Sequence, residues 1–120
     1  MSVPLHIAER TSGDVVILEL RGRLVVDEGE SVLRDHVRSL VTAGHTSLLI
    51  DLGEVSYVDS GGIGTLVQMY KEVTRVGGHF KLLHPSWRST HVLEITHLTT
   101  VFEIYEDEET ALRSMTSAVR

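Results

Sequence analysis

The stretch "SYVDSGGIGTLVQMY", residues 56–70, combines a strand pattern with a helix pattern. Its first residues, up to Val58, are the end of an apolar segment. Asp59, Ser60 and two glycines follow. Ile63, Leu66 and Tyr70 follow at the three- and four-residue spacing of one helical face. The stretch therefore predicts a strand, a tight turn and a helix in immediate succession, with Ser60 on the turn.

Short apolar segments on both sides of this turn predict further strands. The run "SLLIDL" (47–52) is almost continuously apolar, as expected for a buried central strand. The segments "HFKLL" (79–83) and "VFEIY" (101–105) have the length and composition of shorter strands. All three belong to a region in which strands and helices alternate, which favours a mostly parallel sheet.

The N-terminal region predicts a hairpin. "VVILELRG" (15–22) is rich in β-branched residues and is interpreted as a strand that ends at Gly22. "LHIAER" (5–10) precedes it, and the turn residues "TSGD" between them predict antiparallel pairing. The sheet is therefore expected to be mixed.

Helical segments fill the intervals between the predicted strands. One helix is expected in "DEGESVLRDHVRSLVTAG" and ends near Gly44, and a second follows Ser60. A third is expected from Pro85 to about Ile95, and a fourth in the acidic C-terminal segment from residue 106. The predicted fold is a single α/β domain over residues 1–120, with an N-terminal hairpin, a mostly parallel sheet and about four helices.

Composition narrows the class of function. The 120 residues carry a formal net charge of −6, and no segment supplies the basic patch that nucleic acid requires. There is no cysteine, and the N-terminus lacks the pattern of a signal peptide. We expect a cytoplasmic protein that does not insert into membranes and needs no cofactor or metal.

Ser60 itself allows several interpretations. A hydrolase elbow requires glycine two residues before the serine, and Val58 stands there instead. A phosphate-binding P-loop requires a lysine that "GGIGTLVQ" lacks, although a helix N-terminus still attracts anions, so a small nucleotide-binding domain stays an alternative. Serine is also a preferred helix N-cap, with the glycines permitting a tight turn.

The chain resembles the STAS domain, which sulphate transporters share with anti-sigma factor antagonists. The family pattern around the serine is Asp-Ser-small-Gly-hydrophobic-Gly after a strand that ends in Asp-Leu. Residues 59–64, "DSGGIG", and Asp51-Leu52 match it in order and spacing. "GRL" (22–24), "GGHFKLL" (77–83) and residues 92–112 also resemble the flanking family segments, so the likeness covers about residues 5–115.

This resemblance implies a protein-binding switch without catalysis of its own. In stand-alone antagonists, the first hydroxyl after the motif's aspartate is phosphorylated by a serine kinase that is also the anti-sigma factor. The unphosphorylated antagonist binds that kinase and frees the sigma factor, and a phosphoprotein phosphatase resets the switch. By position, the residue phosphorylated here is Ser60. A scaffold subunit or a transporter-associated STAS subunit is the alternative within the same fold.

Two positions depart from the family pattern. The residue after the serine is often Ser or Thr, whereas Gly61 stands here and leaves Ser60 as the sole hydroxyl on the turn. Many members carry an aspartate directly after the "Gly-x-Leu" segment, whereas this chain has Val25, with Asp27 two residues later. The acid that this family position supplies is therefore absent here.

The partner surface is expected on the exposed side of the helix after Ser60. If the apolar stripe faces the core, other positions face outward, and glycines let a partner approach the backbone. Met69 is expected at the edge of the core. The loops 58–62 and 84–87 should open onto one surface, which would bring Trp87 near Ser60, either as an aromatic anchor or packed on the sheet edge. The predicted partner-binding residues are Asp59, Ser60, Gly61, Gly64, Thr65, Gln68 and Trp87.

Overall fold

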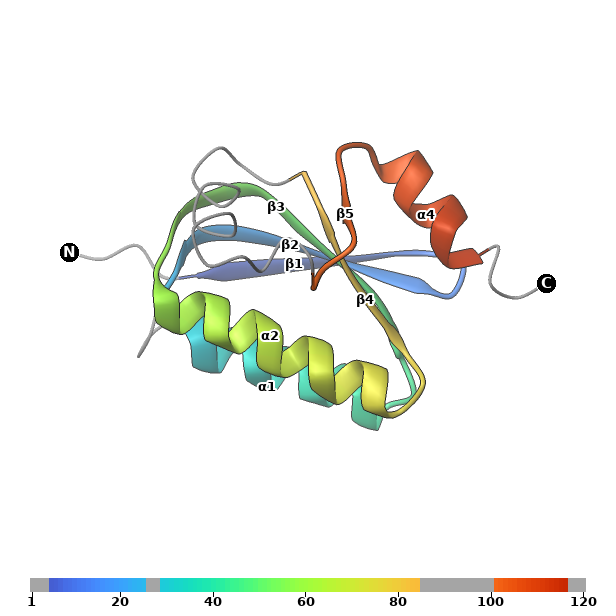
Figure 1. The fold of residues 1–120 in the computed structure, drawn as a ribbon, viewed down its shortest axis with the longest axis horizontal. Coiled ribbons are helices and arrows are strands. Elements are labelled where there is room, and N and C mark those ends of the chain that lie inside the picture. Colours follow the sequence, from blue (N-terminus) through green and yellow to red (C-terminus); the bar gives the residue numbers. More distant parts are fainter. Residues whose placement is uncertain (1–4, 26–28, 85–100, 117–120) are drawn as a thin grey trace.

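A five-stranded sheet with three helices forms the part of the chain that the computed structural model describes, residues 5–25, 29–84 and 101–116 (Figure 1). The strands follow the chain in the sheet, with the first pair antiparallel and the other pairs parallel. The elements are β1 His6–Ser12, β2 Val15–Leu24, α1 Gly29–Thr42, β3 Ser47–Val58, α2 Ser60–Arg75, β4 His79–Leu83, β5 Ile104–Tyr105 and α4 Glu108–Thr116.

This architecture confirms the predicted mixed, mostly parallel α/β sheet with an N-terminal hairpin. The two crossover helices, α1 and α2, lie together on one face, as right-handed crossovers between sequential strands require (Figure 1). The shorter α4 lies on the other face. The helix predicted from Pro85 to Ile95 lies outside the described residues. None of the helices within the described ranges is long and apolar enough to cross a membrane.

The hairpin between β1 and β2 closes through Gly13 and Asp14. Ser12 pairs with Val15, so the connection has two residues, and Gly13 has a φ of 60°. A positive φ at the first of two turn residues is the requirement of a type II′ turn, in which glycine is favoured. The turn chemistry predicted from "TSGD" is therefore confirmed.

The central strands bury side chains on both faces of the sheet. Alternate residues of β2 and β3, among them Leu18 and Ile50, pack beneath α1 and α2 in the larger cluster. The residues between them, such as Ile17 and Leu49, join Ala111 and Met115 of α4 in a smaller cluster. Burial on both faces explains why these strands are continuously apolar, and each large side chain contributes about 1.5–3 kcal/mol.

β2 and β3 are longer than the sequence predicts. β2 continues past Gly22 to Leu24, and β3 continues past Leu52 to Val58. β4 ends at Leu83, which pairs with Asp51, so the last parts of β2 and β3 extend beyond β4. The predicted strand ends at residues 22 and 52 are therefore wrong.

Two register shifts explain why this extension was not predicted. Between Glu19 and Arg21, and again between Gly22 and Arg23, β3 carries one more residue than β2. Each extra residue interrupts the alternation on which strand prediction relies and bends the strand. Gly22 has a φ of 106°, a conformation that favours glycine within the strand and does not end it.

The extension also separates the turn at residues 58–62 from His84, which were expected on one surface. The turn after β3 starts at Asp59, whereas His84 follows β4 beside Asp51. Seven residues of β3 separate the partner of Leu83 from Val58, a length of about 20 Å at strand rise. The structure therefore does not bring His84 next to Ser60, and Trp87 lies outside the described residues.

The last strand is shorter than predicted, and the helix after it starts two residues later. The strand expected over residues 101–105 is reduced to Ile104–Tyr105, which pairs with Leu82 and Leu83. α4 begins at Glu108, after Asp107, whose carboxylate accepts a hydrogen bond from the Thr110 N–H at 3.0 Å. Helices frequently begin after an aspartate whose carboxylate accepts the N–H of the residue three positions later.

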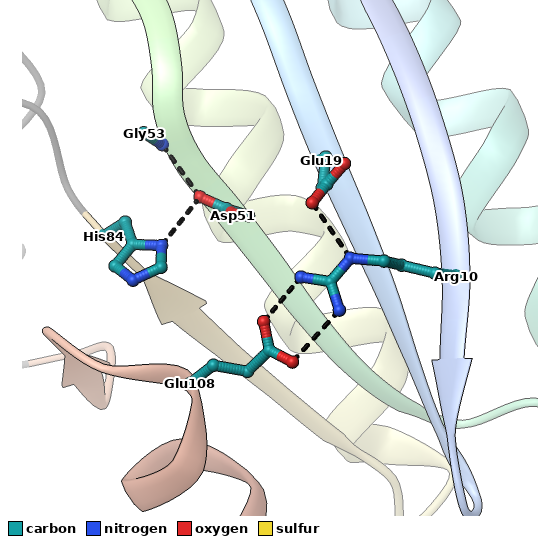
Figure 2. Close-up of polar contacts among 6 residues, drawn as sticks. All are labelled: Arg10, Glu19, Asp51, Gly53, His84 and Glu108. Carbon is teal, nitrogen blue, oxygen red and sulfur yellow. Dashed lines mark hydrogen bonds and ion pairs between the residues drawn. The ribbon is translucent and has the colours of Figure 1, made fainter.

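Polar contacts tie α4 to the sheet (Figure 2). The Arg10 guanidinium donates to both carboxylate oxygens of Glu108, and its Nε donates to Glu19 at 2.9 Å. Lys81 lies almost buried under the helix, where its Nζ donates to the Ser114 hydroxyl at 3.1 Å and lies 3.1 Å from the Glu103 carboxylate. These contacts supplement the small apolar cluster beneath α4.

Beside this network, Asp51 stabilises the first register shift of β3. Its Oδ1 accepts a hydrogen bond from the Gly53 N–H at 2.9 Å and lies 3.4 Å from Nδ1 of His84 (Figure 2). His84 has a φ of 51°, which side-chain-bearing residues rarely adopt. The aspartate of the Asp-Leu motif therefore organises the strand, on the opposite face from α2.

The ion pair between Arg10 and Glu108 gives a pH-dependent prediction. Hydrogen bonds from Arg10 lower the pKa of Glu108 in the folded protein. The stabilising effect of the Glu108 carboxylate is therefore complete above the pKa that Glu108 has in the unfolded chain. It is lost as the pH falls through the lower pKa that Glu108 has in the folded protein. We expect Glu108→Gln to lower the free energy of unfolding by up to about 1 kcal/mol at pH 7, because the pair is partly exposed. The difference should begin to shrink as the pH falls below the ordinary glutamate pKa of about 4.3, and it should disappear only once the pH is below the lowered pKa of Glu108 in the folded protein.

Urea denaturation at several pH values measures this difference. Glu109→Gln is the matched control. Glu109 is the next residue, and its ion pair with Arg113 joins two exposed side chains, 81% exposed for Glu109 and 69% for Arg113. The control should change stability by less than about 0.5 kcal/mol. Equal effects of the two substitutions at pH 7 would contradict the anchoring role of Glu108.

Candidate protein-interaction site

The N-terminus of α2 is capped by Asp59. Asp59 has extended backbone angles, and its Oδ1 accepts a hydrogen bond from the Gly62 N–H at 2.8 Å. The backbone carbonyl of Asp59 accepts from the Ile63 N–H at 3.0 Å, which begins the helical pattern. The prediction that Ser60 is the N-cap is therefore wrong: aspartate caps as well as serine, and Asp59 comes first along the chain.

Ser60 is instead the first residue of α2, and it is exposed. Because Asp59 supplies the cap, the helix start does not depend on the Ser60 side chain. The first turn of α2 carries no acidic residue, so the partial positive charge of the helix N-terminus is not neutralised from within it. An exposed hydroxyl at this position is a suitable acceptor for a phosphoryl group.

A close backbone contact fixes this turn against the end of β2. The Asp59 N–H donates to the Leu24 carbonyl at 3.3 Å. A Cβ placed on Gly62 would lie 2.1 Å from the same Leu24 oxygen, far inside van der Waals contact. Glycine is therefore required at position 62 for α2 to start this close to β2. Gly64, by contrast, has nothing within 4 Å of such a Cβ and is exposed.

The inward and outward faces of α2 mostly follow the predicted pattern. The buried side chains Ile63, Leu66 and Met69 face the sheet, so Met69, expected at the edge of the core, is fully buried within it. Gly64 and Gln68 are exposed, as predicted. The Gln68 amide lies 3.4 Å from the Glu72 carboxylate, within the exposed face of the helix.

Thr65 is the exception. It is 3% exposed, and its hydroxyl donates to the Gly61 carbonyl at 3.2 Å. A threonine can be buried in a helix because the carbonyl four residues earlier accepts its hydroxyl proton. The prediction that Thr65 faces a partner is therefore wrong. The predicted residues that the structure brings together on one surface are Asp59, Ser60, Gly61, Gly64 and Gln68.

A pair of residues close to the Ser60 turn, Tyr57 and Arg23, was missed by the sequence analysis. Tyr57, at the end of β3, is 43% exposed, and the Arg23 guanidinium lies over its ring, 5.4 Å from the centroid. The two are register partners on β2 and β3. Ser56 is the extra residue of β3 at the second register shift, and its hydroxyl donates to the Gly22 carbonyl at 3.1 Å. An aromatic residue two positions before the Asp59 motif was the available signal for this part of the surface.

The described residues offer no metal centre. No group of three or more His, Asp or Glu side chains in residues 5–25, 29–84 and 101–116 is arranged to hold an ion. The chemistry available at the start of α2 is that of an exposed hydroxyl, a capped helix N-terminus and open glycine backbone. This combination suits modification and protein contact.

Comparison with known proteins identifies the family. The STAS domain matches residues 6–111, and the chain belongs to this domain family. A Thermotoga neapolitana protein named as a candidate anti-sigma factor antagonist is 31% identical over 102 residues, covering 85% of this chain and 90% of the relative. The anti-sigma-B factor antagonist of Bacillus subtilis is 37% identical over 78 residues, 65% of this chain and 71% of the relative.

Solved structures agree with this assignment. That of a candidate anti-sigma factor antagonist from Thermotoga maritima has a TM-score of 0.82 at 24% identity, covering 92% of this chain and 94% of its own. That of the Bacillus cell fate determinant SpoIIAA in its phosphorylated form has a TM-score of 0.68 at 22% identity, covering 97% and 99%. At these identities the two structures establish the fold alone. The curated relatives are named as anti-sigma factor antagonists, a class of regulators and not of enzymes, in agreement with the prediction that the chain is not an enzyme.

The Gly62 contact predicts opposite effects of alanine at two nearby glycines. Gly62→Ala should lower the free energy of unfolding by at least about 2 kcal/mol, because the new methyl group would overlap the Leu24 backbone oxygen and force α2 or β2 to shift. Gly64→Ala should leave stability unchanged or raise it by up to about 1 kcal/mol, because alanine favours the helix. Urea denaturation measures both. Equal stability of the two variants would rule out the close approach of α2 to β2.

Proposed function

We propose that this protein is an anti-sigma factor antagonist that binds a kinase-type anti-sigma factor and is released from it when Ser60 is phosphorylated. The observation that carries the proposal is the exposed Ser60 hydroxyl at the first position of α2, within a motif that matches the family. Names of relatives over most of the chain support the antagonist role. A phosphoprotein phosphatase would restore the binding form in the cytoplasm.

Phosphorylation at this position is compatible with the fold. A phosphoserine adds about −1.5 to −2 charges, and the N–H groups and dipole of the first helical turn favour an anion. The neighbouring Asp59 carboxylate offsets part of this gain by repulsion. The α2 helix is therefore expected to persist after phosphorylation. The consequence falls on the exposed surface, where a bulky dianion replaces a small hydroxyl.

The surface around Ser60 supports close approach of another protein. Gly64 is exposed with open space around it, and Gly61 is half-buried, so both present backbone without side chains. Gln68 lies one turn further along the exposed side and supplies an amide for hydrogen bonding. A partner that packs flat on these residues would have no room for a phosphate on Ser60. The partner-binding set proposed for the described residues is Asp59, Ser60, Gly61, Gly64 and Gln68.

Capture of the partner tests the proposal directly. The protein and its Ser60→Ala variant serve as bait in extracts of the source cells, with bound proteins identified by mass spectrometry. We expect a kinase-type anti-sigma factor with both baits. Recovery of transporter subunits and no anti-sigma factor would overturn the proposal and favour a transporter-associated STAS subunit.

Ser60 should be the one efficiently phosphorylated residue when the protein is incubated with that kinase and ATP. Ser56 donates its hydroxyl to the Gly22 carbonyl, and Thr65 is buried, so neither presents a hydroxyl to a kinase as Ser60 does. Mass spectrometry of proteolytic fragments locates the phosphate. We expect incorporation to fall at least about 100-fold in Ser60→Ala. Equal incorporation into Ser56 or Thr65 would sink the assignment.

A carboxylate at position 60 should weaken kinase binding without disturbing the fold. Ser60→Asp places an acid in the first turn of α2, where the dipole favours it, so stability should change by no more than about 1 kcal/mol. At the interface an unpaired buried charge is costly, and we expect binding to weaken at least about tenfold, or about 1.4 kcal/mol.

Ser60→Asn is the matched control, since asparagine has the shape of aspartate without its charge. Titration calorimetry gives the affinity, and thermal melting by circular dichroism gives the stability. We expect Ser60→Asn to bind more tightly than Ser60→Asp. If Ser60→Asp binds the kinase as tightly as the wild type, Ser60 lies outside the interface and the switch mechanism is wrong.

A further inference from the structure

The end of β3 exposes an aromatic side chain beside the proposed switch. Large apolar residues of the same strand, such as Leu48 and Ile50, are fully buried, whereas Tyr57 is 43% exposed. It lies in the part of β3 that extends beyond β4, after the second register shift. Register shifts of this kind re-aim side chains and are frequent beside functional sites. The position of Tyr57 therefore calls for an explanation other than packing of the core.

Arg23 covers the ring but keeps its hydrogen-bonding capacity. Some arginines of this acidic protein hold carboxylates: Arg10 pairs with Glu108 and Glu19, and Arg38 pairs with Glu72. In the described part of the chain, the Arg23 guanidinium forms no ion pair and lies over the Tyr57 ring at 5.4 Å. Stacking on a ring leaves the edge of the guanidinium plane open, where its N–H groups can bind a carboxylate in a bidentate manner.

Arg23, Tyr57 and Ser60 belong to one rigid corner. Arg23 pairs with Tyr57 in the sheet, and the next residue, Leu24, accepts the Asp59 N–H through its carbonyl. The same carbonyl limits position 62 to glycine. The backbone that carries Arg23 is therefore in contact with the backbone of the Ser60 turn, and a partner that covers one meets the other in a fixed geometry.

We propose that Arg23 and Tyr57 form a second contact with the anti-sigma factor, which presents an apolar pocket for the tyrosine ring and a carboxylate for the guanidinium. The proposal rests on the proposed function, because it takes the same partner. Tyrosine and arginine are the residue types that most often dominate binding at interfaces. This contact distinguishes the cognate anti-sigma factor from other kinases of its class, because the Ser60 motif itself is common to the family.

The test measures binding of the captured anti-sigma factor to four variants by titration calorimetry. We expect Tyr57→Ala to weaken binding at least tenfold and Arg23→Ala about tenfold. Arg23→Lys, which keeps the charge but loses the planar fork, should also weaken binding. The effect of Arg23→Ala should shrink between low and high salt, since it removes a charge contact. Val76→Ala is the control, because Val76 is 57% exposed directly after the other end of α2, and it should bind as the wild type does.

The outcomes separate this inference from the proposed function. If Ser60→Asp weakens binding but the Arg23 and Tyr57 variants bind within twofold of the wild type, the inference is wrong and the proposed function stands. If the wild type binds no anti-sigma factor, both are wrong. Thermal melting must show that the variants fold, and the exposure of Tyr57 makes that the expected result. A wild-type dimer in sedimentation analysis that Tyr57→Ala dissociates would assign the surface to a second copy of the chain and overturn the inference.

Discussion

The start of α2 against the Leu24 carbonyl is the contact on which the rest of the site depends. One oxygen accepts the Asp59 N–H and at the same time lies so close to Gly62 that no side chain fits there. A hydrogen bond and a steric limit thus act on the same atom. Together they fix both the position and the direction of the helix whose first residue is Ser60.

The unequal lengths of the strands make this contact possible, because Leu24 lies at the end of the extended β2. β2 and β3 continue past the end of β4, and the register shifts bend β3 on the way to α2 (Figure 1). The extra residues in β3 interrupt the regular backbone hydrogen bonds between β2 and β3. The Ser56 hydroxyl compensates at the Gly22 carbonyl, and the Asp51 carboxylate compensates at the Gly53 N–H. The candidate surface is consequently carried by two strands and a helix end and does not depend on a long loop.

Residue patterns predicted the parts of the fold that rest on local chemistry. The hairpin turn, the buried strands and the core stripe of α2 follow from spacing and turn residues. The cap was assigned to the wrong residue because Asp59 and Ser60 are adjacent and both are good caps. Thr65 was placed on the surface because spacing does not reveal that a small hydroxyl can bond to its own helix. The contact of Arg23 with Tyr57 depends on the register of residues far apart in sequence, which no local pattern contains.

The two clusters on opposite faces of the sheet give the molecule unequal local stability. α1 and α2 share the larger cluster with the central strands, whereas α4 covers a small one and relies on the exposed Arg10 pair and on Lys81. Helices held by few apolar contacts open before the rest of a domain. In amide hydrogen exchange, α4 should therefore exchange ahead of the strands, while the hydrogen-bonded Asp59, Gly62 and Ile63 amides stay protected with the core. Because α2 packs on the larger cluster, the geometry of the corner that carries Ser60 should survive fluctuations of the C-terminal helix.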